Sequence, residues 1–348
     1  MFSKMLHASL LVFASLAVAI AADPSLSLKV SGPAAVDGVD NLKIVTTLTN
    51  TGAETVKVLN DPNGPLSKLP TNTFTITDAS GTTPAFNGVK AKYVPKVAAA
   101  ASAFTILAPG QSIDVEHNLS EAYNFTTSGA GTYDIHPNNL FYLVGDDSSI
   151  ETVHADTASS HSSKVSGKLA VSRSSAVEKR ATYKGCSSSQ QSSLVSAASA
   201  AQSYAASAYS YANSISTGTT RYVTWFGTYT ASRHSTIVSH YQKISGNTFS
   251  SNTYDCTCTE SGTYAYVYPD TFGTIYLCGA FWSAPTTGTD SKGGTLIHES
   301  SHFTVNGGTD DYVYGQSAAK SLAKSNPGEA VFNADNHEYF AENNPAQS

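Results

Sequence analysis

Charged residues are scarce in this chain of 348 residues, making up 13% of it, and they leave a formal net charge of −6. A protein that binds nucleic acid usually presents a basic face, and this balance of charge offers none. Nothing in the sequence favours an anionic membrane surface either. The hydrophobic fraction of 41% is that of a globular protein. We therefore expect no nucleic-acid partner and no membrane partner.

Long apolar runs are also lacking, except near the N-terminus. Lys4 precedes a short apolar run from Leu10 to Ile20, and small residues around Ala21 follow it. The run is too short, and too closely followed by polar residues, for a membrane anchor. A positive charge, an apolar run and small residues in this order are typical of a signal peptide. We predict a signal peptide over residues 1–21, and hence a secreted, extracellular protein.

Cysteine is scarce and unevenly placed. All four cysteines follow residue 180: Cys186, Cys256, Cys258 and Cys278. Secretion makes disulfides available, and four cysteines allow three pairings. Cys256 and Cys258 are too close along an extended chain to pair easily with each other, so each is expected to bond to Cys186 or Cys278. A metal site on the C-T-C spacing is the alternative, but the usual second C-x-x-C or His pair is missing.

The lysines divide the chain at the same place. Most of them precede Arg180, and only five follow it: Lys184, Lys243, Lys292, Lys320 and Lys324. The first part contains short runs that alternate polar and apolar residues, such as 42–48 and 73–77, separated by Gly, Pro, Asn and Asp. Such runs are typical of an antiparallel sandwich. We predict an all-β, sandwich-like unit over residues 22–155.

Residues 156–180 are rich in Ser, Ala and Lys, a composition typical of a linker, and they end in Lys179-Arg180. A dibasic pair at a change of composition, in a secreted chain, indicates proteolytic removal of a pro-segment. A solvated charge pair within a linker is the alternative. We therefore interpret residues 22–155 as an inhibitory or folding-assisting propeptide. An independent sandwich that binds carbohydrate or protein is the other interpretation.

Residues 181–348 predict an α+β domain that is mainly helical with a small antiparallel sheet. Helical spacing of apolar residues recurs in five segments: 189–214, 222–244, 294–303, 312–324 and 327–340. Two runs rich in β-branched and aromatic residues, 264–268 and 274–277, are joined by a turn and predict a hairpin. Cys258 and Cys278 flank this hairpin and could staple it.

The motif H-E-x-x-H occurs once, at His298-Glu299-Ser300-Ser301-His302. Residues four apart share one face of a helix, so both imidazoles can bind one zinc ion while Glu299 lies beside a water molecule. Zinc lowers the pKa of such a water, and a carboxylate then takes its proton. The alternative is a surface helix with two free histidines.

A catalytic zinc ion needs three protein ligands and an open position. The metzincin pattern, with a third His six residues after His302, fails because Gly308 stands there. Four acidic residues downstream are candidates: Asp310, Asp311, Glu329 and Glu338. Gly307 and Gly308 allow the chain to turn back toward the metal, which favours the two nearer aspartates.

The combination of His298-Glu299-x-x-His302 with Gly308-Thr309-x-Asp311-x-x-Tyr314-Gly315 resembles the deuterolysin, or aspzincin, family of fungal metallopeptidases. The resemblance covers about residues 182–348, including 336–345 near the C-terminus, and implies a zincin-like catalytic domain. Within the family, this part of the chain is most similar to the members that cleave on the amino side of lysine.

The resemblance implies three ligands for one zinc ion per chain: His298, His302 and Asp311. It makes Glu299 the general base and Tyr314 the residue that hydrogen-bonds the developing oxyanion, with Asp310 a neighbour and not a ligand. It also implies two disulfides: Cys186–Cys256 and Cys258–Cys278. These pairings agree with the exclusion of a bond between the two neighbouring cysteines.

Asp335 and Glu338 stand three residues apart and share a face if this segment is helical. A pocket for a lysine ammonium requires desolvated negative charge, and the resemblance implies that these two carboxylates line it. From the residues alone, two solvated carboxylates on a C-terminal helix are the simpler interpretation. His337 is a rival metal ligand, but it lies between them on a different face.

The sequence thus predicts a secreted zinc metalloendopeptidase that hydrolyses bonds on the amino side of lysine, with lysine-containing proteins and its own propeptide as partners. One alternative is a deuterolysin-like endopeptidase of broader specificity. A second is a secreted, zinc-stabilised binding protein without catalysis. Glu299 and Tyr314 argue against the second, because a structural zinc site is closed and needs neither a base nor an oxyanion donor.

Overall fold

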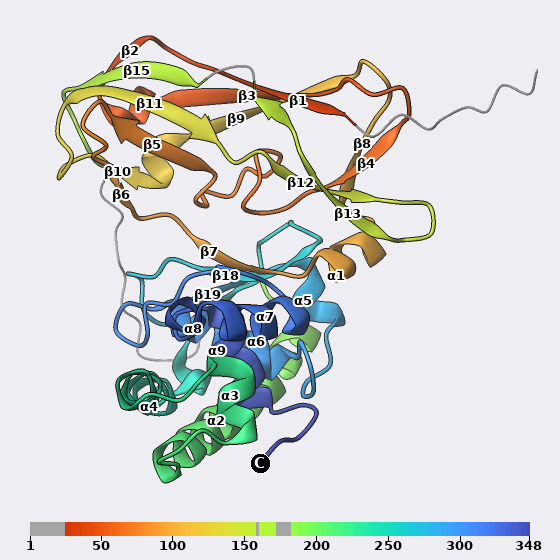
Figure 1. Cartoon of the computed structure of the whole chain (residues 1–348), viewed down its shortest axis with the longest axis vertical. Coiled ribbons are helices and arrows are strands. Elements are labelled where there is room, and N and C mark those ends of the chain that lie inside the picture. The colour runs from red at the N-terminus through yellow and green to blue at the C-terminus, as the bar shows by residue number, and fades with distance from the viewer. Residues whose placement is uncertain (1–24, 158–159, 172–181) are drawn as a thin grey trace, which may run out of the picture.

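The computed structural model describes residues 25–157, 160–171 and 182–348. The predicted signal peptide and the predicted processing pair Lys179-Arg180 lie outside these ranges. Figure 1 shows a β-rich N-terminal part packed on a mainly helical C-terminal part. None of the helices within the described ranges is long and apolar enough to cross a membrane.

Three four-stranded sheets form most of the N-terminal part. Their strand orders are β14(Asp156–Thr157)-β1(Leu26–Ser31)-β3(Lys43–Asn50)-β9(Ser112–Asn118), β2(Ala35–Asp37)-β15(His161–Ser166)-β11(Gly131–Pro137)-β5(Phe74–Asp78), and β13(Ile150–His154)-β12(Leu140–Val144)-β4(Val56–Leu59)-β8(Phe104–Leu107). A small pair, β10(Tyr123–Asn124)-β6(Ala85–Phe86), and the short helix α1(Pro95–Ala100) complete this part. Most neighbouring strands are antiparallel, and their inward-facing residues fill two separate apolar clusters.

Strands β14 and β15 correct the predicted domain boundary. Both lie within residues 156–180, which the composition assigned to a linker. Strand β15 pairs with β11 and β2, and its Ser163 and Val165 are buried while Lys164 between them is exposed. Serine can occupy the buried face of a strand because it is small. A Ser- and Lys-rich composition therefore hid an alternating strand.

Eight helices build most of the C-terminal part of the described chain: α2(Ser188–Ser214), α3(Thr220–Phe226), α4(Ala231–Ser245), α5(Gly279–Ser283), α6(Lys292–His302), α7(Gln316–Ser325), α8(Pro327–Ala330) and α9(Ala334–Glu342). The single helix predicted over 222–244 is wrong, since it is divided into α3 and α4. Gly227 ends α3 with a φ of 71°, a conformation that favours glycine, and the side chain of Thr230 caps α4. The last predicted segment is likewise divided into α8 and α9.

One sheet spans both parts of the molecule. Its order is β16(Thr182–Lys184)-β17(Thr253–Asp255)-β19(Thr274–Leu277)-β18(Thr263–Val267)-β7(Lys90–Tyr93). Strands β16, β17 and β19 run parallel, whereas β18 is antiparallel to both β19 and β7. The sheet is thus mixed, and within residues 182–348 the prediction of an antiparallel sheet holds for the β18–β19 hairpin but not for β16 and β17. The edge strand β7 comes from the N-terminal part (Figure 1).

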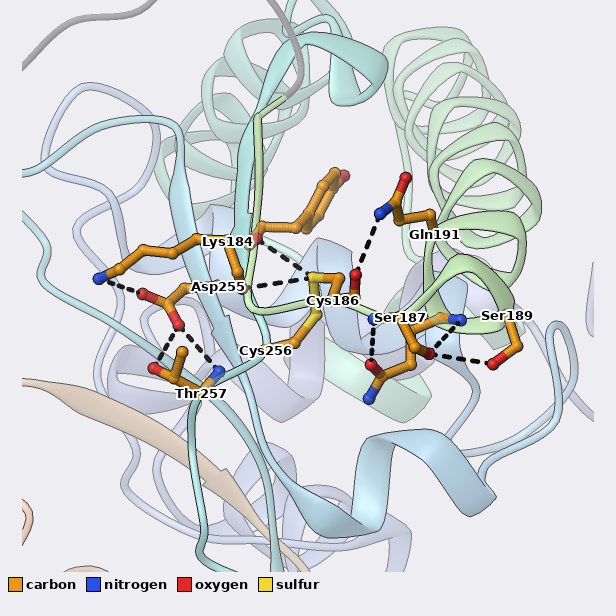
Figure 2. The surroundings of a disulfide bond; sticks show 10 residues. Lys184, Cys186, Ser187, Ser189, Gln191, Asp255, Cys256 and Thr257 are labelled. Carbon is orange, nitrogen blue, oxygen red and sulfur yellow. Dashed lines mark hydrogen bonds and ion pairs between the residues drawn. A yellow bond between two sulfur atoms is a disulfide. The ribbon is translucent and has the colours of Figure 1, made fainter.

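Two disulfides fix the strands of this sheet. Cys256 follows directly on β17 and Cys186 lies two residues after the end of its parallel neighbour β16, so their bond joins the two strand ends (Figure 2). Beside it, Lys184 Nζ lies 2.9 Å from Asp255 Oδ2. The second bond, Cys258–Cys278, closes the β18–β19 hairpin. Both pairings are those that the family resemblance implies.

Helix α6, which carries the H-E-x-x-H motif, lies in the interior of the C-terminal part. Every residue from 293 to 302 is buried. The alanine-rich face of α2 packs closely against it: a Cβ added at Gly293 would lie 2.9 Å from the Cβ of Ala200. Glycine at this position therefore permits the close approach of the two helices. The packing places the motif beside the sheet edge where β7 lies.

Candidate metal centre and active site

Helix α6 presents His298 and His302 on the same face. The side chain of Ser291 caps the helix by accepting a hydrogen bond from Gly294 N at 2.9 Å, which satisfies one of the free N–H groups of the first turn. Both histidines are completely buried, and their ring centroids lie 4.9 Å apart. Two buried imidazoles that face each other in this way form the first two positions of a metal site.

Asp311 supplies the third position. After α6 the chain turns back through Gly308, which has a φ of 56°. The turn brings Asp311 Oδ1 to 3.1 Å from His298 Nε2 and 3.4 Å from His302 Nε2. The resemblance implied these three residues as ligands, and they form a group whose ligand atoms all lie within 4.8 Å of one another.

The protonation of the rings shows why this group fits a metal ion. His302 Nδ1 lies 2.9 Å from the carbonyl oxygen of Thr309, which can only accept, so the ring proton is on Nδ1 and Nε2 carries a lone pair. His298 Nε2, His302 Nε2 and Asp311 Oδ1 are all buried without a hydrogen-bond partner. Two ring nitrogens and a carboxylate oxygen that converge in a buried site favour a bound cation. Two imidazoles and one carboxylate with an open fourth position form the donor set of a catalytic metal.

A second contact orients the other ring. Asp335 Oδ1 lies 2.8 Å from His298 Nδ1, close enough to orient the ring so that Nε2 faces the metal position. Sequence reasoning assigned Asp335 to substrate recognition alone. In the structure Asp335 also contacts the proposed metal ligand His298. Its carboxylate lies between His298 and the side chain of Lys92.

Three rival ligands lie outside the first group: Asp310, Glu329 and His337. Asp310 forms an ion pair with Lys90. His337 Nε2 lies 3.0 Å from His240 Nδ1, away from the α6 histidines, and burial lowers the pKa of His337 to about 3. The fourth candidate, Glu338, lies 3.4 Å from His298 Nδ1, whereas Asp311 faces the other ring nitrogen, Nε2.

Glu299 and Tyr314 both contact one peptide unit of β7. The amide nitrogen of Lys92 lies 3.4 Å from Glu299 Oε1. The hydroxyl of Tyr314 donates to the carbonyl oxygen of Ala91 at 2.8 Å and accepts from Asn63 Nδ2 at 2.7 Å. Burial raises the pKa of Glu299 to about 7. A carboxylate with such a pKa suits general base catalysis near neutral pH.

The side chain of Lys92 fills an acidic pocket next to this peptide unit. Its Nζ lies 2.6 Å from Glu338 Oε2, 3.3 Å from Asp290 Oδ1 and 3.5 Å from Asp335 Oδ1. The lysine side chain is completely buried. Burial by itself would lower the pKa of Lys92, but the charges of Asp335 and Glu338 outweigh it and hold that pKa well above its usual value. The pocket therefore binds a charged ammonium.

Sequence reasoning found two residues of this pocket and missed three. The rings of Tyr264 and Tyr339 face Lys92 Nζ at 5.1 and 5.6 Å, distances at which a ring attracts a cation. Asp290 precedes the cap of α6, and its carboxylate accepts a hydrogen bond from Tyr339 at 2.7 Å. In the sequence, an aspartate directly before a helix cap gives no indication that it binds a cation. Only the packing of α9 against α6 brings it to the pocket.

Comparison with known proteins gives consistent results. A sequence model of the family described as "Lysine-specific metallo-endopeptidase" (Aspzincin_M35) matches residues 211–342. The chain is 60% identical to a peptidyl-Lys metalloendopeptidase of Grifola frondosa, over 99% of this chain and 100% of the relative. It is 57% identical to a protein of the same description from Armillaria mellea, over 95% of each. A solved structure described as a zinc peptidase from Grifola frondosa is 67% identical over 47% of this chain and all of its own, with a TM-score of 0.47.

Proposed function

The chain belongs to the aspzincin family of metalloendopeptidases, and on that basis we propose that it is a secreted zinc enzyme that hydrolyses peptide bonds on the amino side of lysine. The observation that carries the proposal is the pocket of Asp290, Asp335 and Glu338 around a buried ammonium. It adjoins the peptide unit that Glu299 and Tyr314 contact. The relatives described as peptidyl-Lys metalloendopeptidases support the same specificity.

The residues of the site divide the chemistry among them. His298, His302 and Asp311 would hold the zinc ion, which would supply a Lewis acid for lowering the pKa of water and polarising a carbonyl group. Glu299 accepts a proton from the attacking water and delivers it to the nitrogen of the leaving amine. The contact of Glu299 with the amide nitrogen of Lys92 supports this second role. Tyr314 donates a hydrogen bond to the carbonyl oxygen as negative charge develops there.

Substrate binding uses the edge of the mixed sheet. Strand β18 pairs antiparallel with β7, with Ala265 opposite Lys92 and Tyr266 opposite Ala91. A substrate that adds as a strand to this edge would have its backbone fixed by the same hydrogen bonds. Alternate side chains point to the same side of a strand, so that one lysine enters the acidic pocket. The three carboxylates favour this reading over an endopeptidase of broader specificity.

We also propose that the N-terminal part is a propeptide and that the chain is made as a zymogen. Strand β7 occupies the edge where a substrate would bind, so another chain cannot enter while it is there. Removal after Lys179-Arg180 would release the C-terminal part as the mature enzyme. The two disulfides support secretion, because such bonds persist in oxidising compartments.

Digestion of an unfolded protein, followed by sequencing of the new N-termini, tests the proposed specificity. We expect lysine at the first position of nearly all new termini. New N-termini that begin with various residues, without an excess of lysine, would contradict the proposed lysine specificity. The same digest made after treatment with a chelator should yield no new termini, and adding back Zn²⁺ should restore them.

A further inference from the structure

Strand β7 lies in the active site although it belongs to the N-terminal part. Its residues 91–93 are buried, and β7 forms the outer strand of the mixed sheet, next to β18. In Figure 1 it runs along the boundary between the two parts, apart from the other N-terminal strands. Strand β7 could serve only to hold the two parts together, or it could occupy the place of a substrate. The atoms that it contacts distinguish these two roles.

The backbone contacts of β7 are those expected of a bound substrate. Tyr314 donates to the carbonyl oxygen of Ala91, the atom on which negative charge develops during hydrolysis. Glu299 lies next to the nitrogen of Lys92, the atom that must take up a proton when the bond breaks. The amide nitrogen of Ala91 lies 3.2 Å from Oδ2 of the metal ligand Asp311. The peptide bond between Ala91 and Lys92 is therefore the one presented to the catalytic groups.

The side chains select the same bond. Lys92 fills the acidic pocket on the amine side of this bond, which is where the proposed specificity requires a lysine. Two other lysines nearby do not enter it. Lys90 is paired with Asp310, and Lys96 is exposed on α1. The chain thus offers three lysines within a few residues and places only one of them for cleavage.

Water can reach the site from one side. A cavity of about 580 Å³ lies between the two parts, lined by Asp311 and Tyr314 on one side and by Asp61 and Asn63 on the other. Polar and apolar side chains both line it, and it is large enough for several water molecules. The bound strand therefore leaves Asp311 and Tyr314 next to space that water can fill, whereas Glu299 is buried behind them.

We propose that β7 is an internal substrate and that the Ala91–Lys92 bond is the first bond that the enzyme hydrolyses in its own chain; this rests on the proposed function. One water molecule is consumed. Its oxygen bonds to the carbonyl carbon of Ala91, the C–N bond breaks, and both water protons pass in turn through Glu299 to the nitrogen of Lys92. The products are a carboxylate at Ala91 and a protonated amine at Lys92. Until then Lys92 keeps the pocket closed to other chains.

A time course on the full chain tests this proposal. The chain is purified in a chelator, hydrolysis is started with Zn²⁺, and fragments are followed by mass spectrometry and N-terminal sequencing. We expect fragments that begin at Lys92 to appear first, with a rate constant independent of protein concentration. Fragments that begin at Lys90 or Lys96 should follow later, at a rate that rises with concentration, because they arise between molecules.

An unfolded protein added to the same reaction separates the two proposals. Lysine at the new N-termini of the added protein would support the proposed function. If the Ala91–Lys92 bond then stays intact, or is cut no earlier than the bonds before Lys90 and Lys96, the internal-substrate proposal is overturned. If neither chain shows an excess of lysine at its new termini, the proposed specificity itself fails.

Two variants sharpen the test. Lys92→Ala should slow the first cut at least a hundredfold, because the pocket then holds no ammonium on the amine side of the bond. Lys96→Ala, a change of the same kind at an exposed position, should behave like the unchanged chain. Equal rates of first cleavage in the two variants would contradict the proposal.

A chemical measurement covers the case in which Lys92→Ala fails to fold. In the full chain with Glu299→Gln, which keeps the strand uncut, an amine-reactive acetylating reagent should modify Lys96 and leave Lys92 unmodified. Modification of both lysines at similar rates would show that Lys92 does not occupy the pocket, and would overturn the proposal without any measurement of activity.

Discussion

The hydroxyl of Tyr314 lies 2.8 Å from the carbonyl oxygen of Ala91, a residue 223 positions earlier in the chain. This one contact joins the proposed oxyanion donor to the backbone of the N-terminal part. It gives a common explanation for the edge strand, the buried Lys92 and the acidic pocket, because all three follow from a peptide bound in the manner of a substrate.

Replacing Glu299 by Gln should abolish hydrolysis while the metal stays bound. Glutamine keeps the shape of the side chain but cannot take a proton, and general base catalysis contributes on the order of 10²- to 10⁴-fold. Metal content by atomic absorption should remain one ion per chain, since Glu299 is not in the ligand group. Glu329→Gln, on α8 and outside that group, is the matched control. Hydrolysis that survives in Glu299→Gln would remove Glu299 from the mechanism.

Asp335 and Glu338 should differ in their effect on the metal. Asp335 lies 2.8 Å from a metal ligand, so Asp335→Ala should weaken metal affinity roughly 10- to 100-fold as well as reduce selection of lysine. Glu338→Gln should reduce selection of lysine with a much smaller change in metal affinity, because its nearest contact is the ammonium. Competition with a chelator measures the first effect, and the sequences of new N-termini measure the second. Identical losses of metal would contradict the orienting role of Asp335.

Asp290→Asn should reduce kcat/KM for lysine substrates by about tenfold without loss of metal. A hydrogen bond to a charged group is worth about 1.5–3 kcal/mol, and the partly exposed carboxylate of Asp290 places the effect at the lower end. The asparagine keeps the size of the side chain, so that its hydrogen bond with Tyr339 can persist. Kinetics on a lysine peptide, with metal content measured in parallel, test this. An unchanged kcat/KM would exclude Asp290 from the pocket.

Acid should destabilise the N-terminal part through His117. Burial lowers the pKa of this histidine from 6.5 to about 4, and its ring lies between Thr46 and Phe74. As pH falls from 6.5 to 4, the unfolded chain binds a proton that the folded chain does not. Stability is therefore complete above pH 6.5 and falls by up to about 3 kcal/mol toward pH 4.

Thermal unfolding of the full-length Glu299→Gln chain at several pH values measures this effect. His117→Asn should show a shallower loss of stability in acid than the unchanged chain, whereas His154→Asn, at an exposed position on β13, should not. Parallel pH profiles for all three proteins would show that His117 does not contribute to the acid sensitivity.

Much of the catalytic site could be predicted from the sequence because it is local. His298, Glu299 and His302 lie within two turns of one helix, and Asp311 and Tyr314 follow within a short turn. Their spacing and the family resemblance were enough to group the ligands. The hairpin β18–β19 and the long helix α2 could also be predicted, because the spacing of apolar residues in each segment shows which of its residues are buried.

Other features could not be predicted because they depend on which segments pack together. The direction of β16 and β17 relative to β19, the strand hidden in residues 161–166, and the place of Asp290 beside Lys92 leave no periodic signal in the sequence. Strand β7 is the clearest case, because Lys90-Ala91-Lys92-Tyr93 reads as an ordinary surface segment. The sequence by itself determined the H-E-x-x-H motif, its place on a helix and a change of composition, whereas the ligand set was predicted with the help of the family resemblance. Only the tertiary structure decided that one lysine of the N-terminal part lies in the acidic pocket, since burying that charge is favourable only where three carboxylates surround it.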